Sequence, residues 1–310
     1  LELVRGEFTR DDVINTLDVF SETMLGKGVV SCSDTPGFLA NRVGVFAIQC
    51  ALHKAFEFGL SPTEADAFFG RPIGLPKTGV FGLYDLIGID LMADVVKSLV
   101  SILPENDAFH KYSSPIDFMT AMIGNGQTGN KNEKGFYKQL GDERQVIDLS
   151  SGIYVTHERL KTPLLEEAEK IGISFILKDK SPYGLYIWDV IAETLCYAAS
   201  LVPEITDDLT QIDDAMKLGY NWVKGPFELL DEIGIEYFVD RLKNDGRAVP
   251  KFILKGLNNK FYNHSKSKLS FLSPDGNLKP IIRSNGVLRF SELRQTLKAK
   301  NSNESASWFE

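Results

Sequence analysis

The chain repeats itself at a spacing of 146 residues, and this repeat constrains the fold more than any other feature of the sequence. The dipeptide TP at 35–36 and the dipeptide SP at 181–182 each open a long apolar stretch, and 181 − 35 = 146. The block GVFGLYDLIGID at 79–90 returns as GPFELLDEIGIE at 225–236, and 225 − 79 = 146. Two landmarks at one spacing predict two copies of one structural unit in tandem.

Most of the chain shows the spacing of apolar residues that is typical of helices, so the sequence predicts a mainly all-α fold. Residues 9–25 are expected to form a helix that begins at Thr9 as its N-cap. Residues 35–59 are expected to form a second helix, with Thr35 as the cap and Pro36 in the first turn. Its wide apolar arc predicts burial on most sides.

Two regions differ from this helical pattern. Residues 141–155 are expected to form a short hairpin, and residues 162–172 a linking helix. Residues 270–290 hold short strand-like runs separated by Pro and Gly. The predicted class is therefore helical, with small β-containing segments in a linker and a tail.

The composition excludes several classes of protein. With 34 basic and 42 acidic residues the net charge is −8, which argues against a nucleic-acid partner. No run of about 18 apolar residues occurs, so no membrane span is expected. Three scattered cysteines, Cys32, Cys50 and Cys196, predict neither a disulfide framework nor a zinc site, and a reducing, cytoplasmic location is expected. Both ends of the chain resemble internal positions of a longer protein.

One glycine-rich segment matches the sequence pattern of a nucleotide-binding motif. Residues 124–129 match the pattern GxGxxG, but they follow a helix-like segment, and residues 130–134 do not open an apolar helix. A dinucleotide site needs strand, turn and helix in that order, so we expect a structural turn here and no cofactor site within the chain. The four histidines show no metal-ligand spacing, so no metal site is predicted.

Three motifs together carry a resemblance to a known family: DTPGFLANR at 34–42, the repeated block at 225–236 and GFYK at 135–138. In combination they resemble the C-terminal helical domain of 3-hydroxyacyl-CoA dehydrogenases. The tandem arrangement is similar to that of multifunctional fatty acid β-oxidation proteins, in which two such units follow one dinucleotide-binding domain. The resemblance implies NAD-dependent oxidation of (S)-3-hydroxyacyl-CoA to 3-oxoacyl-CoA, with NAD held by the upstream domain.

The resemblance also implies a division of the chain into five segments. They are the tail end of a nucleotide-binding region with a linking helix at 1–34, a first helical unit at 35–138, a linker at 139–180, a second helical unit at 181–265 and a bridge at 266–310. The bridge is similar to one that leads, in one subgroup, into an enoyl-CoA hydratase domain.

Two residues match positions of the family that take part in the reaction. Glu2 matches a glutamate that holds the imidazole of a catalytic histidine, which lies upstream of this chain in the family. Such a carboxylate fixes the tautomer of the imidazole and stabilises the imidazolium. Asn41 matches the asparagine of a Phe-x-x-Asn-Arg motif and is expected to orient an oxygen of an acyl-CoA substrate. Without the histidine and NAD, this segment alone is expected to be inactive.

Each assignment has a structural alternative. Glu2 is then a solvated terminal acid, and Asn41 an amide that satisfies backbone groups at a helix crossing. The neighbouring Arg42 is expected to form an ion pair on the surface or between domains. Two alternatives also exist for the whole chain: a purely structural dimerisation module, and a related hydroxyacid dehydrogenase with a non-CoA substrate. The presence of both Glu2 and Asn41 favours the dehydrogenase, and the tandem copy favours a CoA substrate.

The second copy is expected to be a structural partner of the first. The spacing of 146 places Ile187 opposite Asn41 and Trp188 opposite Arg42, so apolar side chains replace polar ones. We expect the two copies to pack against each other as an intramolecular pseudo-dimer. The residues expected to line the contact come from the repeated block: Phe81, Leu83, Phe227 and Leu229.

Overall fold

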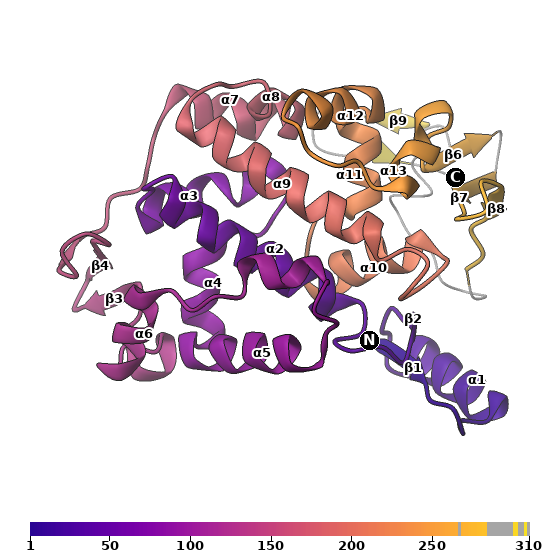
Figure 1. Ribbon diagram of the computed structural model, residues 1–310, viewed down its shortest axis with the longest axis horizontal. Helices are drawn as coiled ribbons and strands as arrows, with labels where there is room; N and C mark the ends of the chain where they lie inside the picture. The colour runs from indigo at the N-terminus through magenta and orange to yellow at the C-terminus, as the bar shows by residue number, and fades with distance from the viewer. Residues whose placement is uncertain (266–267, 284–299, 303–306, 309–310) are drawn as a thin grey trace.

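The computed structural model describes residues 1–265, 268–283, 300–302 and 307–308. The described chain is mainly helical with small sheets, which confirms the predicted class (Figure 1). None of its helices is long and apolar enough to cross a membrane. Free cysteines are found at all three positions, Cys32, Cys50 and Cys196.

The elements fall into an N-terminal segment, two units with a short helical link, and a C-terminal end. The N-terminal segment contains β1 (Glu2–Arg5), α1 (Asp11–Val19), the π-helical η1 (Phe20–Met24) and β2 (Val30–Ser33). The first unit contains α2 (Ala40–Glu57), α3 (Pro62–Phe68), η2 (Arg71–Ile73), α4 (Gly79–Ile87), α5 (Ile89–Ile102), η3 (Ala108–Tyr112), α6 (Asp117–Gly124), η4 (Asn130–Asn132), β3 (Tyr137–Leu140), β4 (Glu143–Ile147) and β5 (Tyr154–Thr156). The link is α7 (Pro163–Ile171) and α8 (Ile173–Ile176).

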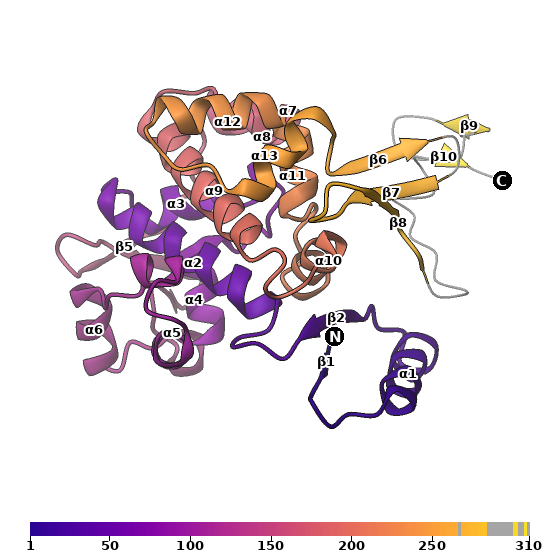
Figure 2. The ribbon, with the colours of Figure 1, turned by 45° about the vertical axis from the view of Figure 1, so that its right-hand side comes forward.

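The second unit repeats this order. It contains α9 (Pro182–Ser200), α10 (Leu209–Gly219), α11 (Pro226–Ile233), α12 (Ile235–Asn244), α13 (Lys251–Lys255), η5 (Gly256–Asn258), β6 (Tyr262–Ser265), β7 (Lys268–Leu272) and β8 (Leu278–Pro280). The short strands β9 (Asn301–Ser302) and β10 (Ser307–Trp308) pair near the C-terminus. Helices α2 to α5 correspond to α9 to α12, and each unit ends in an antiparallel three-stranded sheet, β3-β4-β5 or β6-β7-β8. Figure 2 shows the second sheet extending away from the helices.

These sheets run past the boundaries expected from the sequence. The boundary after residue 138 falls inside β3, and the boundary after residue 265 falls between the paired strands β6 and β7. The strands expected in residues 141–155 and 270–290 are therefore parts of the repeated unit where the structure describes them. Residues 284–290 lie outside the described part of the chain.

Helices α2 and α9 lie against each other at the centre of the molecule (Figures 1 and 2). The rings of Phe46 and Tyr197 stack with their centroids 4.0 Å apart. The hydroxyl of Tyr186 donates to the carbonyl of Ala51 at 3.2 Å. Helix α10 packs on α2 and α3 packs on α9, so each unit places corresponding elements on the other.

The residues expected to line this contact include two wrong assignments. Phe81 packs on Phe136, with ring centroids 4.6 Å apart, and Phe227 packs on Phe261 at 5.0 Å. The first pair lies within the first unit, and the second pair lies within the second unit. The apolar face of the repeated block is therefore occupied by the aromatic residue that begins the sheet of the same unit, and the contact between units is made by other helices.

Two caps predicted from the sequence are also wrong. Helix α1 begins at Asp11, because the amide of Thr9 closes a turn on the carbonyl of Gly6 and leaves Arg10 as the N-cap. Helix α2 begins at Ala40, five residues after Thr35, whose buried hydroxyl has no hydrogen-bond partner among the described residues. In the second copy, the side chain of Ser181, which corresponds to Thr35, does cap its helix α9, with a proline in the first turn.

Each sheet is held on its unit by one carboxylate of the repeated block, which is buried in the first unit and half-buried in the second. Asp85 accepts the amides of Phe136 at 2.8 Å and Tyr137 at 2.7 Å. Asp231 accepts the amides of Phe261 and Tyr262, at 2.9 and 2.8 Å. The GFY motif is thus a structural element, since two consecutive amides bind one carboxylate, and this arrangement extends the repeat to the sheets.

The Asp85→Asn variant should lose one component of the pH dependence of stability. Burial raises the pKa of Asp85 to about 6, above the value of about 3.9 in unfolded chains. This group therefore stabilises the fold fully below about pH 4, and its contribution, about 3 kcal/mol, is lost as the pH rises through about 6. Urea unfolding of both proteins between pH 4 and 7 measures the difference.

The exposed substitution Asp240→Asn is a control that should leave the pH profile unchanged. A difference between wild type and Asp85→Asn that stays constant from pH 4 to 7 would show that Asp85 titrates normally.

Candidate functional site

Glu2 lies at the N-terminus of α2, where strand pairing places it. Strand β1 runs parallel to β2, with Glu2 opposite Val30. The Oε1 atom of Glu2 accepts the amides of Leu39 at 2.7 Å and Ala40 at 2.8 Å. Amides at a helix N-terminus lack partners within the helix, and a negative charge there is favourable. Glu2 therefore caps α2 in the place of Thr35, and its Oε2 makes no hydrogen bond to any described residue.

The turn before α2 explains why the local cap fails. Gly37 and Phe38 both have positive φ, +76° and +50°. This left-handed turn brings the amides of residues 39 and 40 toward β1 instead of toward Thr35. A glycine favours such a φ, whereas Phe38 adopts it at a cost in backbone strain.

Asn41 follows these two amides directly and has an exposed side chain. Its Oδ1 accepts a hydrogen bond from the hydroxyl of Tyr220, at 3.3 Å. Tyr220 is the residue that ends α10, so it belongs to the second unit. The structure therefore brings Glu2 and Asn41 together at one end of α2, beside a group from the other copy.

Tyr220 was not predicted from the sequence, although one signal for it exists. A Cβ atom on Gly44 would lie 2.1 Å from Cζ of Tyr220, so only a glycine lets this ring lie on the helix. A glycine inside an apolar helix often marks the close approach of another group. Gly44 is such a glycine, one turn after Asn41.

Tyr220 determines which hydrogen bonds Asn41 can offer. Burial, with a smaller contribution from Glu2, raises the pKa of Tyr220 to about 12, so its hydroxyl stays a donor at neutral pH. Because that hydroxyl donates to Oδ1, the Nδ2 group of Asn41 points its two protons elsewhere. Nδ2 has no hydrogen-bond partner within the described residues, and it can donate to an oxygen of a ligand.

Arg42, the next residue, turns into the protein and is fully buried. Its Nη2 pairs with Asp107 at 2.6 Å, and its Nε donates to the Tyr197 hydroxyl at 3.0 Å. Glu204 lies at 3.4 Å from Nη1. Asp107 belongs to the first unit, whereas Tyr197 and Glu204 belong to the second, so Arg42 pairs within its own unit and also contacts the other.

The second copy has no polar group for a ligand at the corresponding place. Ile187 is fully buried, whereas Asn41 is exposed. Trp188 is also buried, and its Nε1 donates to Asp245 at 2.6 Å. The helix face that presents a free amide in the first copy is a packing face in the second.

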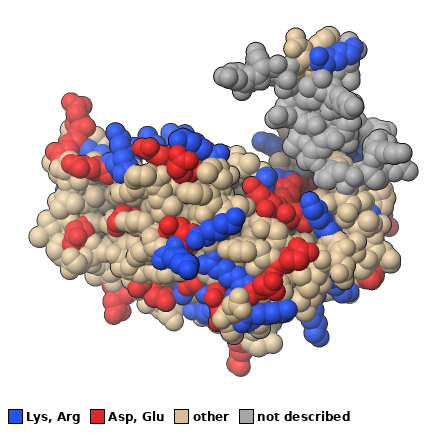
Figure 3. All heavy atoms as spheres, turned by 90° about the horizontal axis from the view of Figure 1, so that it is seen from above, with Lys and Arg blue, Asp and Glu red and all other residues tan. Residues whose placement is uncertain are grey.

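The remaining sequence motifs do not form a site in the described structure. Residues 124–129 begin with the last residue of α6 and lead through a turn into η4, so the structure lacks the strand that a dinucleotide motif needs. No group of three or more His, Cys, Asp or Glu side chains within the described ranges is placed to hold a metal ion. On the face drawn in Figure 3, basic side chains lie among acidic ones and form no continuous basic surface.

Comparison with known proteins gives a consistent set of relatives. A model of the 3-hydroxyacyl-CoA dehydrogenase C-terminal domain matches residues 37–139. A protein of Rickettsia prowazekii described as a fatty acid oxidation complex trifunctional enzyme is 39% identical over 74% of this chain and 32% of its own length. A protein of Bacillus subtilis described as a 3-hydroxyacyl-CoA dehydrogenase is 31% identical over 98% of this chain and 40% of its own. The chain thus spans about a third to two fifths of these relatives.

A solved structure agrees with the fold. The crystal structure of 3-hydroxybutyryl-CoA dehydrogenase from Escherichia coli matches 84% of this chain and 67% of that chain. The TM-score is 0.57 and the sequence identity is 20%. At this identity the likeness concerns the fold alone.

The Arg42→Ala variant should be strongly destabilised. Removing one partner of a buried ion pair leaves the other charge uncompensated, which costs about 3–5 kcal/mol. Here the remaining charge is Asp107, whose side chain is 8% exposed. Urea unfolding at pH 7 measures the loss. As a control, the Arg10→Ala variant removes an exposed ion pair with Asp12 and should unfold like the wild type. Equal stability of Arg42→Ala and Arg10→Ala would contradict a role for Arg42 in joining the units.

Proposed function

The chain belongs to the 3-hydroxyacyl-CoA dehydrogenase family, and we propose that it is the substrate-side part of such an enzyme in fatty acid β-oxidation. The reaction proposed is the oxidation of (S)-3-hydroxyacyl-CoA to 3-oxoacyl-CoA. NAD, when bound, accepts the hydride. The described residues offer no strand, glycine turn and helix in sequence, so the NAD site is assigned to an upstream nucleotide-binding domain of the whole protein.

One observation carries this proposal: Glu2 and Asn41 meet at the same end of α2, and each has an unused polar atom. Glu2 uses Oε1 for the amides of Leu39 and Ala40, which holds the carboxylate in a fixed position. Its Oε2 is then placed to accept the N–H of an imidazole. Asn41 accepts the Tyr220 hydroxyl through Oδ1, which leaves its Nδ2 unused among the described residues.

These groups suit the oxidation of a secondary alcohol. A histidine from the upstream domain, oriented by Glu2, would take the hydroxyl proton while the hydride leaves C3. A neutral donor such as Asn41 can orient the thioester or hydroxyl oxygen without adding charge to the site. Since the histidine and the hydride acceptor both belong to another domain, this chain by itself is expected to have no dehydrogenase activity.

Several details of the whole protein follow as parts of the proposal. The Rickettsia relative is described as a trifunctional enzyme, which supports further catalytic domains in this protein, with an enoyl-CoA hydratase domain downstream as the expected one. Helix α10 of the second unit packs on α2, and α3 of the first unit packs on α9; these reciprocal contacts support an intramolecular pseudo-dimer of the two copies. A cytoplasmic location is supported by the three free cysteines.

The two alternatives are less well supported. A purely structural dimerisation module has no use for the exposed amide of Asn41 and its partner from the other unit. A hydroxyacid dehydrogenase with a non-CoA substrate shares the helical fold, but the relatives described above carry CoA dehydrogenase or fatty acid oxidation names.

This 310-residue chain should fold and should have no micromolar site for NADH. The reason is that the glycine-rich turn at 124–129 follows a helix and offers no dinucleotide site. Calorimetric titration with NADH measures binding, and a far-UV circular dichroism spectrum dominated by helix shows that the protein used was folded. Micromolar binding of NADH to the helical chain would contradict the assignment of the NAD site to another domain.

In the full-length enzyme, Asn41→Ala should lower kcat/KM by at least about tenfold. Tyr220→Phe should lower it in the same direction but less, because Asn41 stays in place and loses only its orienting partner. Ile187→Ala is the matched control in the second copy: it should lower stability by about 2–5 kcal/mol and leave turnover per folded molecule unchanged.

The outcome that would reverse the roles of the two copies is specific. Asn41→Ala would leave steady-state kinetics unchanged, while Ile187→Ala would abolish turnover of protein shown by circular dichroism to be folded.

A further inference from the structure

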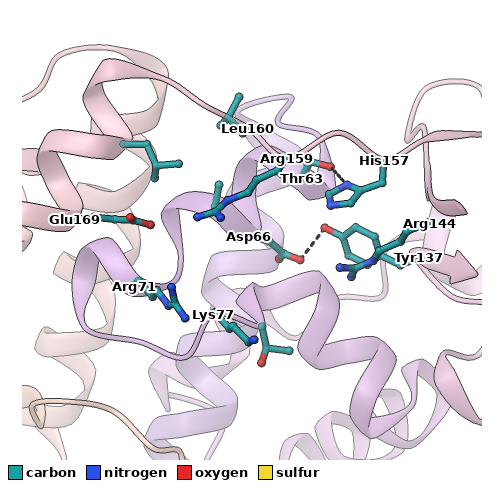
Figure 4. A pocket seen from close by; sticks show the side chains of 13 residues that line it. Thr63, Asp66, Arg71, Lys77, Tyr137, Arg144, His157, Arg159, Leu160 and Glu169 are labelled. Carbon is teal, nitrogen blue, oxygen red and sulfur yellow. Dashed lines mark hydrogen bonds between the residues drawn. The ribbon is translucent and has the colours of Figure 1, made fainter. Parts of the chain in front are cut away.

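A cavity lined by the first unit and by the link lies away from Glu2 and Asn41. It has a volume of about 350 Å³ and is bounded by α3, the turn before α4, the β3-β4 hairpin, residues 157–160 and α7 (Figure 4). Figures 1 and 2 place these elements at the other end of the unit from the N-terminal strand. A cavity of this size is in the range that holds a small molecule.

Four cationic side chains from separate segments line the cavity. They are Arg71, Lys77, Arg144 and Arg159. All four are exposed to solvent, and none of them forms an ion pair with a carboxylate of the described residues, although the chain has a net charge of −8. In an acidic protein, four unpaired cations around one cavity leave a positive potential there.

The carboxylates of the cavity do not cancel this charge. Asp66 accepts the amides of Phe81 and Gly82 at 2.7 and 3.0 Å and the hydroxyl of Tyr137 at 2.8 Å. Burial raises its pKa to about 7, so at neutral pH it carries only part of a charge. Glu169 on α7 is the other lining carboxylate; it is exposed, as the four cations are, and its single charge leaves the lining positive overall.

The neutral groups of the cavity fit an anionic ligand as well. His157 lies 3.0 Å from the Thr63 hydroxyl through its Nδ1. Burial and the positive charge of Arg144 lower the pKa of His157, which agrees with a positive potential in the cavity. Arg144 itself lies over the ring of Tyr137, 4.2 Å from its centroid, which holds the guanidinium at the wall.

The corresponding region of the second unit is neutralised. Lys217 lies at the end of α10, as Arg71 lies after α3. Lys217 pairs with Glu228 at 2.7 Å and with Asp214 at 3.3 Å. The lysine of the second unit that corresponds to Arg71 is therefore paired, whereas Arg71 is not.

We propose that this cavity binds a small organic molecule that carries a diphosphate group. The planar guanidinium groups of Arg71, Arg144 and Arg159 each match two oxygens of a phosphate, and Lys77 adds a compact charge. The Thr63 hydroxyl and the imidazole of His157 provide neutral contacts. The proposal does not depend on the dehydrogenase reaction, because no group of the Glu2 and Asn41 site takes part.

The test is calorimetric titration of this chain with inorganic pyrophosphate and with ADP at about 0.15 M ionic strength, where weak surface attraction is screened. We expect one site with a submillimolar Kd for each probe. The double variant Arg71→Gln/Lys77→Gln should bind both at least about tenfold more weakly, because charge-assisted hydrogen bonds are among the strong ones.

The matched control removes two exposed lysines far from the cavity, Lys243→Gln/Lys251→Gln, and should bind as the wild type does. Thermal unfolding without ligand checks that both double variants fold; if the cavity variant does not, Arg159→Gln replaces it in the same titration. Absence of pyrophosphate binding to the wild type, equal weakening in both double variants, or binding of pyrophosphate without ADP would each overturn the proposal.

Discussion

The contact between α2 and α9 is the constraint on which the rest of the structure depends. Each helix is buried along most of its length, so neither can lie on the surface of a single unit. Burying both at once requires the second copy to pack on the first. The buried Arg42 reinforces this requirement, since its guanidinium needs Asp107 from one unit and Tyr197 from the other.

The two copies share one arrangement of helices but differ in the side chains at corresponding positions. The same helix face presents Asn41 to solvent in the first copy and buries Ile187 in the second. The second copy nevertheless contributes to the site, because Tyr220 at the end of α10 reaches Asn41 across the contact. A purely structural partner would leave Asn41 free to rotate, whereas this partner fixes the amide. In the proposed enzyme, duplication thus allows one copy to lose its ligand-facing group and to gain a positioning role.

The sequence predicts those features that depend on local pattern. The mainly helical class follows from the spacing of apolar residues, and the long helix α9 begins at the SP dipeptide that the repeat pointed to. The cap at Thr35 was predicted wrongly because the acceptor that replaces it, Glu2, lies 37 residues before Leu39, whose amide it accepts. Phe81 was assigned to the wrong contact for a similar reason: its partner Phe136 is brought to it by the carboxylate of Asp85, which binds the GFY amides. Long-range acceptors of this kind leave no periodic signal in a sequence.

The two interpretations of Glu2, a structural group and a group that orients a base, are compatible in this geometry. A carboxylate has two oxygens, and the helix N-terminus occupies only Oε1. Two short hydrogen bonds from rigid backbone amides fix the plane of the carboxylate, and therefore the direction of Oε2. A base held by a flexible side chain would lose orientation, and a site displaced by 1 Å can lose much of its rate. The cap of α2 thus supplies the rigidity that the proposed role of Glu2 needs, and it places that role beside Asn41, on the next residue of the same helix.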